Sequence, residues 1–226
     1  MKTIAFAGLV IGLLLIGSSG TSQVLAPELG QKQVEVGFAH IWSRRDMERF
    51  GSQEFDWEDD VFFIRYGIID RLTVWGEGSI WDRGKADRFP GRDYRVYNIG
   101  IGFTLRLLEA GRFRVAAAAV FSEGFWFDRS ASKYHKEVKS KAVAVWIEGR
   151  LYPHGQEVSL WGGPAYAVDE YVEYPWGTHR EAKWKSADDF GGAFGINVFI
   201  LRHVDVFSHI VYAGYLQPRT GIGWRF

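Results

Sequence analysis

Serine, histidine and acidic residues stand near one another at a few places in this sequence, and hydrolysis uses these residue types. Ser208-His209, with Asp205 just before them, supplies a nucleophile, a base and an orienting acid. The surrounding residues alternate as in a β-strand, where neighbours point to opposite faces, so Ser208 and His209 cannot meet. The acid pairs Asp59-Asp60 and Asp188-Asp189 stand at the expected ends of two strands. We predict no catalytic residue, and a surface hydrolase acting on peptide or lipid A is the least favoured function.

Metal, cofactor and nucleic-acid chemistry have little support in the residue types. The chain has no cysteine, which removes disulfides, thiolate ligands and a cysteine nucleophile. Asp169-Glu170 has no third acid beside it, and no group of His, Asp and Glu has the spacing of a metal site. Lys and Arg number 27 and Asp and Glu number 27, so there is no basic excess. We predict no metal, no cofactor and no nucleic-acid partner.

The first 26 residues have the pattern of a secretory signal peptide. Lys2 supplies a positive start, and an apolar run of thirteen residues covers 4–16. This run is shorter than the approximately 20 apolar residues that a transmembrane helix needs. Val24-Leu25-Ala26 offers small residues at the positions that a signal peptidase reads, with Gly20 and Ser22 as alternatives. We expect residues 1–26 to be removed on export and residues 27–226 to form one domain.

The remaining chain alternates with a period of two, which is the pattern of β-strands. In the segment 96–107, Tyr97, Ile99 and Ile101 lie on an apolar face, opposite Asn98 and small residues. The same alternation predicts ten strands, at about 33–45, 58–69, 72–83, 94–107, 112–127, 138–152, 156–172, 187–202, 204–213 and 217–226. Eight and twelve strands are the alternatives, because the last two strands alternate less cleanly.

The connections between these strands alternate in length, and this predicts a transmembrane barrel. Short turns at 70–71, 109–111, 153–155 and 202–203 alternate with longer polar loops at 46–57, 84–93, 128–137 and 173–186. We therefore expect an all-β fold, a closed antiparallel up-and-down barrel with its apolar face toward lipid. The alternative is a soluble barrel of the lipocalin kind, which would turn the apolar face inward.

The end of the sequence resembles the C-terminal signal of bacterial outer-membrane β-barrel proteins. Ile222, Trp224 and Phe226 lie on one face of an aromatic strand that ends in phenylalanine. The segment 65–74 also resembles the strand, two-residue turn and strand that are common in that family. The resemblance implies that the barrel-assembly machinery reads Ile222, Trp224 and Phe226, and that the protein lies in the outer membrane of a diderm bacterium.

Enzymes of that family carry motifs that this sequence lacks. Omptin proteases have ten strands, acid pairs and an Asp-x-His, and no Asp-x-His occurs here. The His-x-Ser of lipid A deacylases and the Asp-Ser of lipid A palmitoyltransferases are absent as well. The resemblance therefore implies the barrel and its location, and it implies no enzymatic activity.

The inward face of the expected barrel carries charges of both signs, which predicts a mutually paired network in a largely closed lumen. The residues are Glu35, Arg65, Glu77, Arg106, Arg114, Glu148, Arg150, Asp205 and Arg225. A selective pore lines its wall with one sign of charge, and small barrels are filled by side chains. A structural or surface-interaction role is the favoured function, and a narrow diffusion pore for small solutes is the alternative.

The aromatic and charged segment 169–185 could contact lipopolysaccharide phosphates, but we favour a solvated loop whose aromatic residues rest on the membrane rim. The expected partners are outer-membrane lipid, lipopolysaccharide and, during biogenesis, the assembly machinery. We expect a monomer.

Overall fold

The computed structural model describes residues 29–48, 52–86, 94–128, 134–152, 157–173, 182–186, 190–200, 203–213 and 215–226. The expected signal peptide lies outside these residues. The strands are β1 (Val34–Glu48), β2 (Ser52–Ile69), β3 (Leu72–Ala86), β4 (Tyr94–Ala110), β5 (Phe113–Asp128), β6 (Tyr134–Leu151), β7 (Glu157–Glu173), β8 (Ala182–Ser186), β9 (Phe190–Ile200), β10 (Val204–Ala213) and β11 (Tyr215–Arg225). Among the described residues, no helix is long and apolar enough to cross a membrane.

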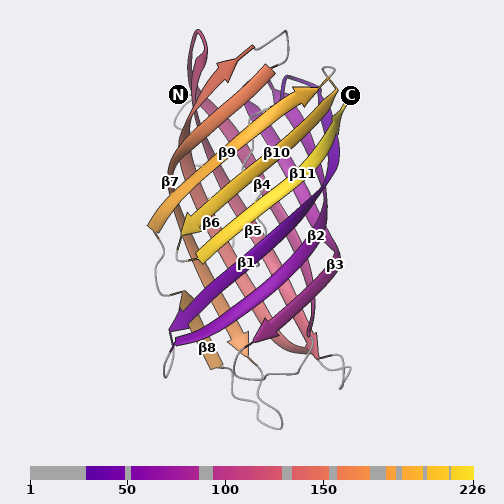
Figure 1. Cartoon of the computed structure of the whole chain (residues 1–226), viewed down its shortest axis with the longest axis vertical. Helices are drawn as coiled ribbons and strands as arrows, with labels where there is room; N and C mark the ends of the chain where they lie inside the picture. Colours follow the sequence, from indigo (N-terminus) through magenta and orange to yellow (C-terminus); the bar gives the residue numbers. More distant parts are fainter. Residues whose placement is uncertain are drawn as a thin grey trace, which may run out of the picture.

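Ten of these strands form a closed antiparallel barrel, as the alternation predicts (Figure 1). Each strand from β1 to β7 pairs with the next, β7 pairs with β9, and β9, β10 and β11 follow in order. The barrel closes where β11 pairs with β1, with Phe38 opposite Ile222. Closure satisfies the backbone groups that an open sheet edge would leave unpaired. The ten-strand fold is confirmed, and the alternatives of eight and twelve strands are wrong.

The two ends of the barrel differ. One end, which we call the turn end, carries the tight turns at 70–71 and 111–112, where Gly111 adopts a φ of 60°. Glycine suits this turn because it has no Cβ to oppose a positive φ. The other end, which we call the loop end, lies at the bottom of Figure 1 and carries the longest connections, at 87–93 and 174–181. The long loop expected at 46–57 is wrong, because β1 extends to Glu48 and β2 begins at Ser52.

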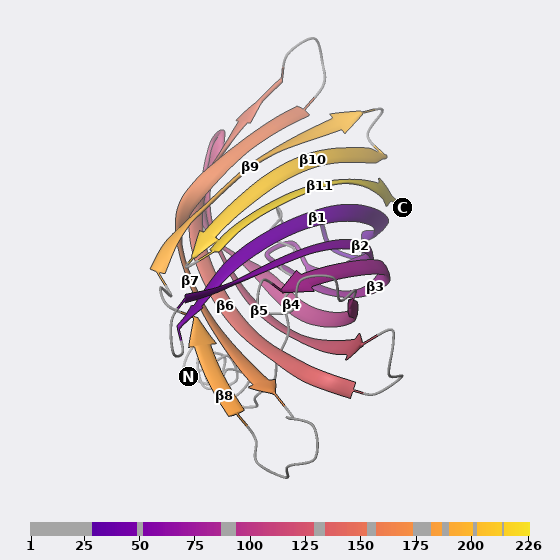
Figure 2. The same cartoon turned by 60° about the horizontal axis from the view of Figure 1, so that its bottom comes forward.

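The segment expected as a loop at 173–186 contains a strand, and this corrects the expectation. β8 pairs with the loop-end part of β7, at Glu170–Glu173, and with Met47 and Glu48 of β1 (Figure 2). β7 and β1 extend farther toward the loop end than the hairpin of β10 and β11, which ends around residue 214. The parts of β7 and β1 that extend beyond this hairpin have edges that need backbone partners. β8 pairs with both of these edges.

The apolar rows face outward and the polar rows face the lumen. Ile99, Ile101 and Ile147 are more than 60% exposed, whereas the intervening Asn98 is 1% exposed. This orientation agrees with the transmembrane expectation, and the alternative of a soluble barrel with an apolar interior is wrong.

Candidate functional site

Large side chains from several strands point into the lumen. Trp146, Phe63, Arg65 and Glu35 point inward, and each is between 0% and 1% exposed. Neighbouring side chains cover each of these residues almost completely. The filling consists of a charged cluster near the turn end, an aromatic layer, and a second polar cluster that adjoins this layer.

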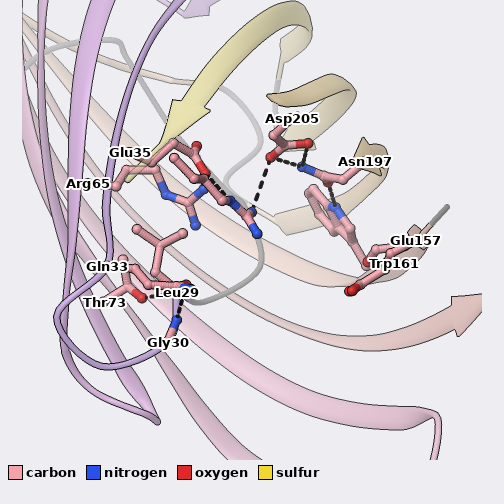
Figure 3. Close-up of polar contacts among 12 residues, drawn as sticks. Leu29, Gly30, Gln33, Glu35, Arg65, Thr73, Glu157, Trp161, Asn197 and Asp205 are labelled. Atoms are coloured by element: carbon pink, nitrogen blue, oxygen red, sulfur yellow. Dashed lines mark hydrogen bonds and ion pairs between the residues drawn. The ribbon is translucent and has the colours of Figure 1, made fainter. Parts of the chain in front are cut away.

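The cluster near the turn end joins residues from five strands (Figure 3). Glu35 accepts from Arg65 at 2.8 Å and from Arg225 at 2.7 Å. Arg225 also lies 3.5 Å from Asp205, which accepts a 2.9 Å hydrogen bond from the amide of Asn197. Buried carboxylates and guanidinium groups need such partners, because removing them from water is costly.

A layer of aromatic rings crosses the lumen from β6 to β2. The ring centroids of Trp146 and Trp161 are 5.4 Å apart, and those of Trp161 and His209 are 4.9 Å apart. His209 stacks on Phe207 at 4.7 Å, and Phe207 meets Phe63 at 5.7 Å. Because these residues come from β6, β7, β10 and β2, the rings connect nearly opposite walls of the barrel.

The second polar cluster adjoins the aromatic layer. Arg219 of β11 reaches across the lumen to Glu77 of β3, with 2.9 Å between nitrogen and oxygen. Its guanidinium carbon lies within 6 Å of the rings of Phe63 and Phe207. Nearby, Asp59 accepts from Asn98 at 2.7 Å and from Ser79 at 3.0 Å.

Glycines in neighbouring strands make room for the large lumen side chains. Gly195 lies opposite Trp161, and a Cβ on Gly195 would lie 2.4 Å from the indole. Gly37, Gly102 and Gly221 lie opposite Phe63, Trp75 and Phe207 in the same way. The glycines on the polar face of the sequence therefore match the aromatic residues that fill the barrel.

Residues Leu29–Gln33 lie at the turn end of the lumen. The amide of Leu29 donates a 2.7 Å hydrogen bond to the buried hydroxyl of Thr73, and the Leu29 side chain is 1% exposed. The amide of Lys32 donates to the carbonyl of Gly67 at 2.7 Å. This segment adds to the filling of the barrel at that end.

The predicted lumen residues divide into four groups, one of which is Glu77 with its partner Arg219. Glu35, Arg65, Asp205 and Arg225 lie together in the cluster near the turn end. Glu148 is buried and lies 2.8 Å from Arg150, which also contacts Glu157 at 3.2 Å.

Arg106 and Arg114 differ from the expectation of a buried network. Both pair with Glu109, at 2.7 Å and 2.6 Å, and the side chain of Glu109 is 41% exposed. Glu109 lies directly opposite Arg114 where β4 ends and β5 begins, so the end of β4 supplies the partner of both arginines.

Arg219, the partner of Glu77, was not among the predicted residues. The alternation that places Gly221, Gly223 and Arg225 inward also places Arg219 inward. Counting every second residue along the strand could therefore have identified it. Asp59 could have been placed inward in the same way from Val61 and Phe63.

The candidate hydrolytic groups are separated by the wall of the barrel. His209 is buried in the lumen and Ser208 is exposed outside, as predicted. Asp59 faces the lumen, whereas Asp60 faces outward and contacts His40. Asp188-Asp189 lies outside the described residues. Within the described ranges, no group of three His, Asp or Glu residues could hold a metal ion.

The outer wall decides the class of protein. Ile222, Trp224 and Phe226, the expected assembly signal, are each about half exposed or more, and Phe194 is 60% exposed. A closed barrel with long apolar rows on its outer face is built to span a bilayer. The chain is a β-barrel of the transmembrane type.

Comparisons with known proteins gave matches among solved structures only. No family model and no curated protein matches the sequence. The translocator domain of autotransporter NalP from Neisseria meningitidis is 11% identical, with a TM-score of 0.43 over 100% of this chain and 95% of that chain. Outer membrane protease OmpT from Escherichia coli is 9% identical, with a TM-score of 0.39 over 91% of this chain and 100% of that chain. Outer membrane protein OprG from Pseudomonas aeruginosa is 10% identical, with a TM-score of 0.40 over 88% of this chain and 99% of that chain.

Proposed function

We propose that this outer-membrane barrel is a closed, non-enzymatic scaffold with a structural or surface-interaction role. The observation that supports this most directly is the burial of the lumen. Trp161, Phe207, His209 and Arg219 all lie on the path through the barrel, and none is more than 4% exposed. A water-filled pathway would expose the side chains that line it.

The mixed charge of the lumen also favours a closed barrel over the alternative of a narrow pore. The cluster near the turn end pairs two acids with two arginines. It therefore does not present the lining of one charge sign that an ion-selective pore uses. Separating these pairs would leave buried charges without partners, which costs several kcal/mol. A solute would have to pay this cost at each cluster.

The location that we propose is the outer membrane of a diderm bacterium. The signal-peptide pattern of residues 1–26 supports export, and the terminal strand supports recognition by the barrel-assembly machinery. Outer-membrane lipid and lipopolysaccharide are the proposed surroundings, and we propose a monomer because β11 and β1 close the barrel within one chain.

Planar-bilayer recording tests the closed lumen. We expect wild-type protein, with insertion verified by heat modifiability on a gel, to show no steady nanosiemens-scale openings. The variant Trp146→Ala/Trp161→Ala removes two indoles from the aromatic layer and should show more frequent small openings, because it leaves a cavity in the middle of the lumen. Steady nanosiemens-scale conductance of the wild-type protein would show that the lumen is a pore.

A further inference from the structure

Four polar side chains form a row on the outer wall. Ser208 of β10 lies opposite Thr220 of β11, Thr220 opposite His40 of β1, and His40 opposite Asp60 of β2. All four face outward, and His40 Nδ1 lies 2.6 Å from Asp60 Oδ1. Directly opposed residues of adjacent strands have Cβ atoms about 5 Å apart, so these side chains form one continuous polar row.

The rows on either side are apolar. The row toward the turn end contains Val206, Ile222, Phe38 and Phe62, which also oppose one another across the same four strands. On the loop side, Ile210 lies opposite Pro218, and the ring of Trp42 contacts His40. Hydroxyl, imidazole and carboxyl groups facing hydrocarbon are costly unless a partner satisfies their hydrogen bonds.

A groove of about 660 Å³ lies over this row. Ser208 and Thr220 have short side chains, and bulkier residues surround them, so the wall is hollowed at these two positions. The lining residues include Ile196, Val206, Ile222, Phe38, His40 and Asp60. The volume falls within the range of sites that hold a small-molecule ligand.

The row runs obliquely into the membrane. The strands cross the barrel axis at an angle, and in Figure 1 a step from β10 toward β2 leads toward the loop end. With strands about 4.8 Å apart and tilted by about 40°, each step changes the depth by about 3 Å. Ser208 therefore lies about 9 Å deeper than Asp60 by the same arithmetic, and the exposed Glu58 continues the polar surface beyond Asp60.

We propose that the groove binds one acylated lipid of the leaflet on the loop side. The acyl chain fills the hollow against Ile196, Val206 and Ile222. The ester, amide or hydroxyl groups that join the chain to its headgroup meet the hydroxyls of Thr220 and Ser208 and the free ring nitrogen of His40. Asp60 holds the imidazole through Nδ1, which leaves Nε2 for the ligand.

An amphiphile matches this groove better than a second copy of the barrel does. The row begins near the expected membrane surface and descends into the apolar belt, and a lipid has its polar linkages and its chain in the same order. A second barrel would present its own convex wall and would leave the hollow at Ser208 and Thr220 unfilled. The proposal concerns the outer wall and does not depend on whether the lumen conducts.

Native mass spectrometry of the full chain, extracted in mild detergent from vesicles of phosphatidylethanolamine, phosphatidylglycerol and lipid A, tests the proposal. We expect wild-type monomer to retain one acylated lipid. Thr220→Val keeps the shape of the side chain and removes the hydroxyl, so retention should fall about three- to tenfold, as for the loss of one hydrogen bond. Ser208→Leu fills the hollow and should abolish retention.

Ala117→Leu provides the matched control. Ala117 faces outward on β5, on the opposite wall, and the variant should retain lipid as the wild type does. Heat modifiability on a gel verifies folding of each variant, and the isosteric Thr220→Val keeps the test decisive if Ser208→Leu does not fold. The proposal is wrong if wild type retains no lipid, if Thr220→Val and Ala117→Leu retain lipid equally, or if wild type is a lipid-free dimer.

Discussion

Replacing Arg219 by methionine should destabilise the barrel far more than the same change at Arg106. Arg219 is 3% exposed in its side chain and pairs with Glu77, which is 0% exposed, so the substitution leaves a buried carboxylate without its cation. Removing one member of a buried ion pair costs about 3–5 kcal/mol. Methionine keeps part of the packing against Phe63 and Phe207, so most of this cost is electrostatic.

Arg106 is the matched comparison, because it is also an inward arginine with a carboxylate partner at 2.7 Å. Its partner Glu109 is 41% exposed and is resolvated when the arginine is lost. Exposed ion pairs contribute at most about 1 kcal/mol, so Arg106→Met should cost about that amount.

The assay is urea unfolding of the barrel refolded into lipid vesicles, followed by tryptophan fluorescence, with free energies taken from midpoints and slopes. A second variant separates charge from packing: Arg219→Met/Glu77→Gln removes the orphaned charge and should recover at least half of the loss, because neutral replacement of a buried pair is often tolerated. Equal destabilisation by Arg219→Met and Arg106→Met would refute the reasoning, as would a double variant no more stable than Arg219→Met.

Two further substitutions test other contacts of the lumen. Gly195→Ala should destabilise the barrel by about 1–3 kcal/mol in the same urea assay, because its Cβ would lie 2.4 Å from the Trp161 ring. Gly76→Ala, where the nearest atom is 3.7 Å from the new Cβ, is the control, and equal effects would contradict close packing. Thr73→Val removes the acceptor for the Leu29 amide and should speed hydrogen exchange of that amide about tenfold, a loss of about 1 kcal/mol. Unchanged exchange would show that the Thr73 bond does not hold the segment.

The sequence predicts the faces of the wall well because side chains on a strand alternate over long stretches, interrupted only at irregularities such as that between Arg106 and Leu108. The alternation places Glu35, Arg65 and Asp205 in the lumen. Counting back from Arg225 by every second residue places Arg219 there too. The alternation does not give height within the barrel, since height depends on the stagger between strands. Arg219 and Glu77 are 142 residues apart, and only the closed register brings them to one level.

Two features depend on several strands at once and were therefore beyond the sequence pattern. β8 forms because β7 and β1 extend past the hairpin of β10 and β11, and a comparison of strand lengths requires the register. The outer polar row joins His40 and Asp60 to Thr220 and Ser208, from opposite ends of the chain. In the sequence these residues interrupt four separate apolar rows, and nothing in any single row marks them as neighbours.

The two faces of the wall therefore satisfy their polar groups from different sources. In the lumen, Glu35 and Glu77 have arginine partners from other strands, so substitutions there change the free energy of unfolding. On the outer wall, the hydroxyls of Ser208 and Thr220 have no side-chain partner among the described residues, and a bound lipid would supply one. Thr220→Val should consequently lower lipid retention with little change in the urea midpoint, whereas Arg219→Met should lower the midpoint with little change in lipid retention. If both variants changed both quantities together, the outer row would be part of the structural framework and not a lipid site.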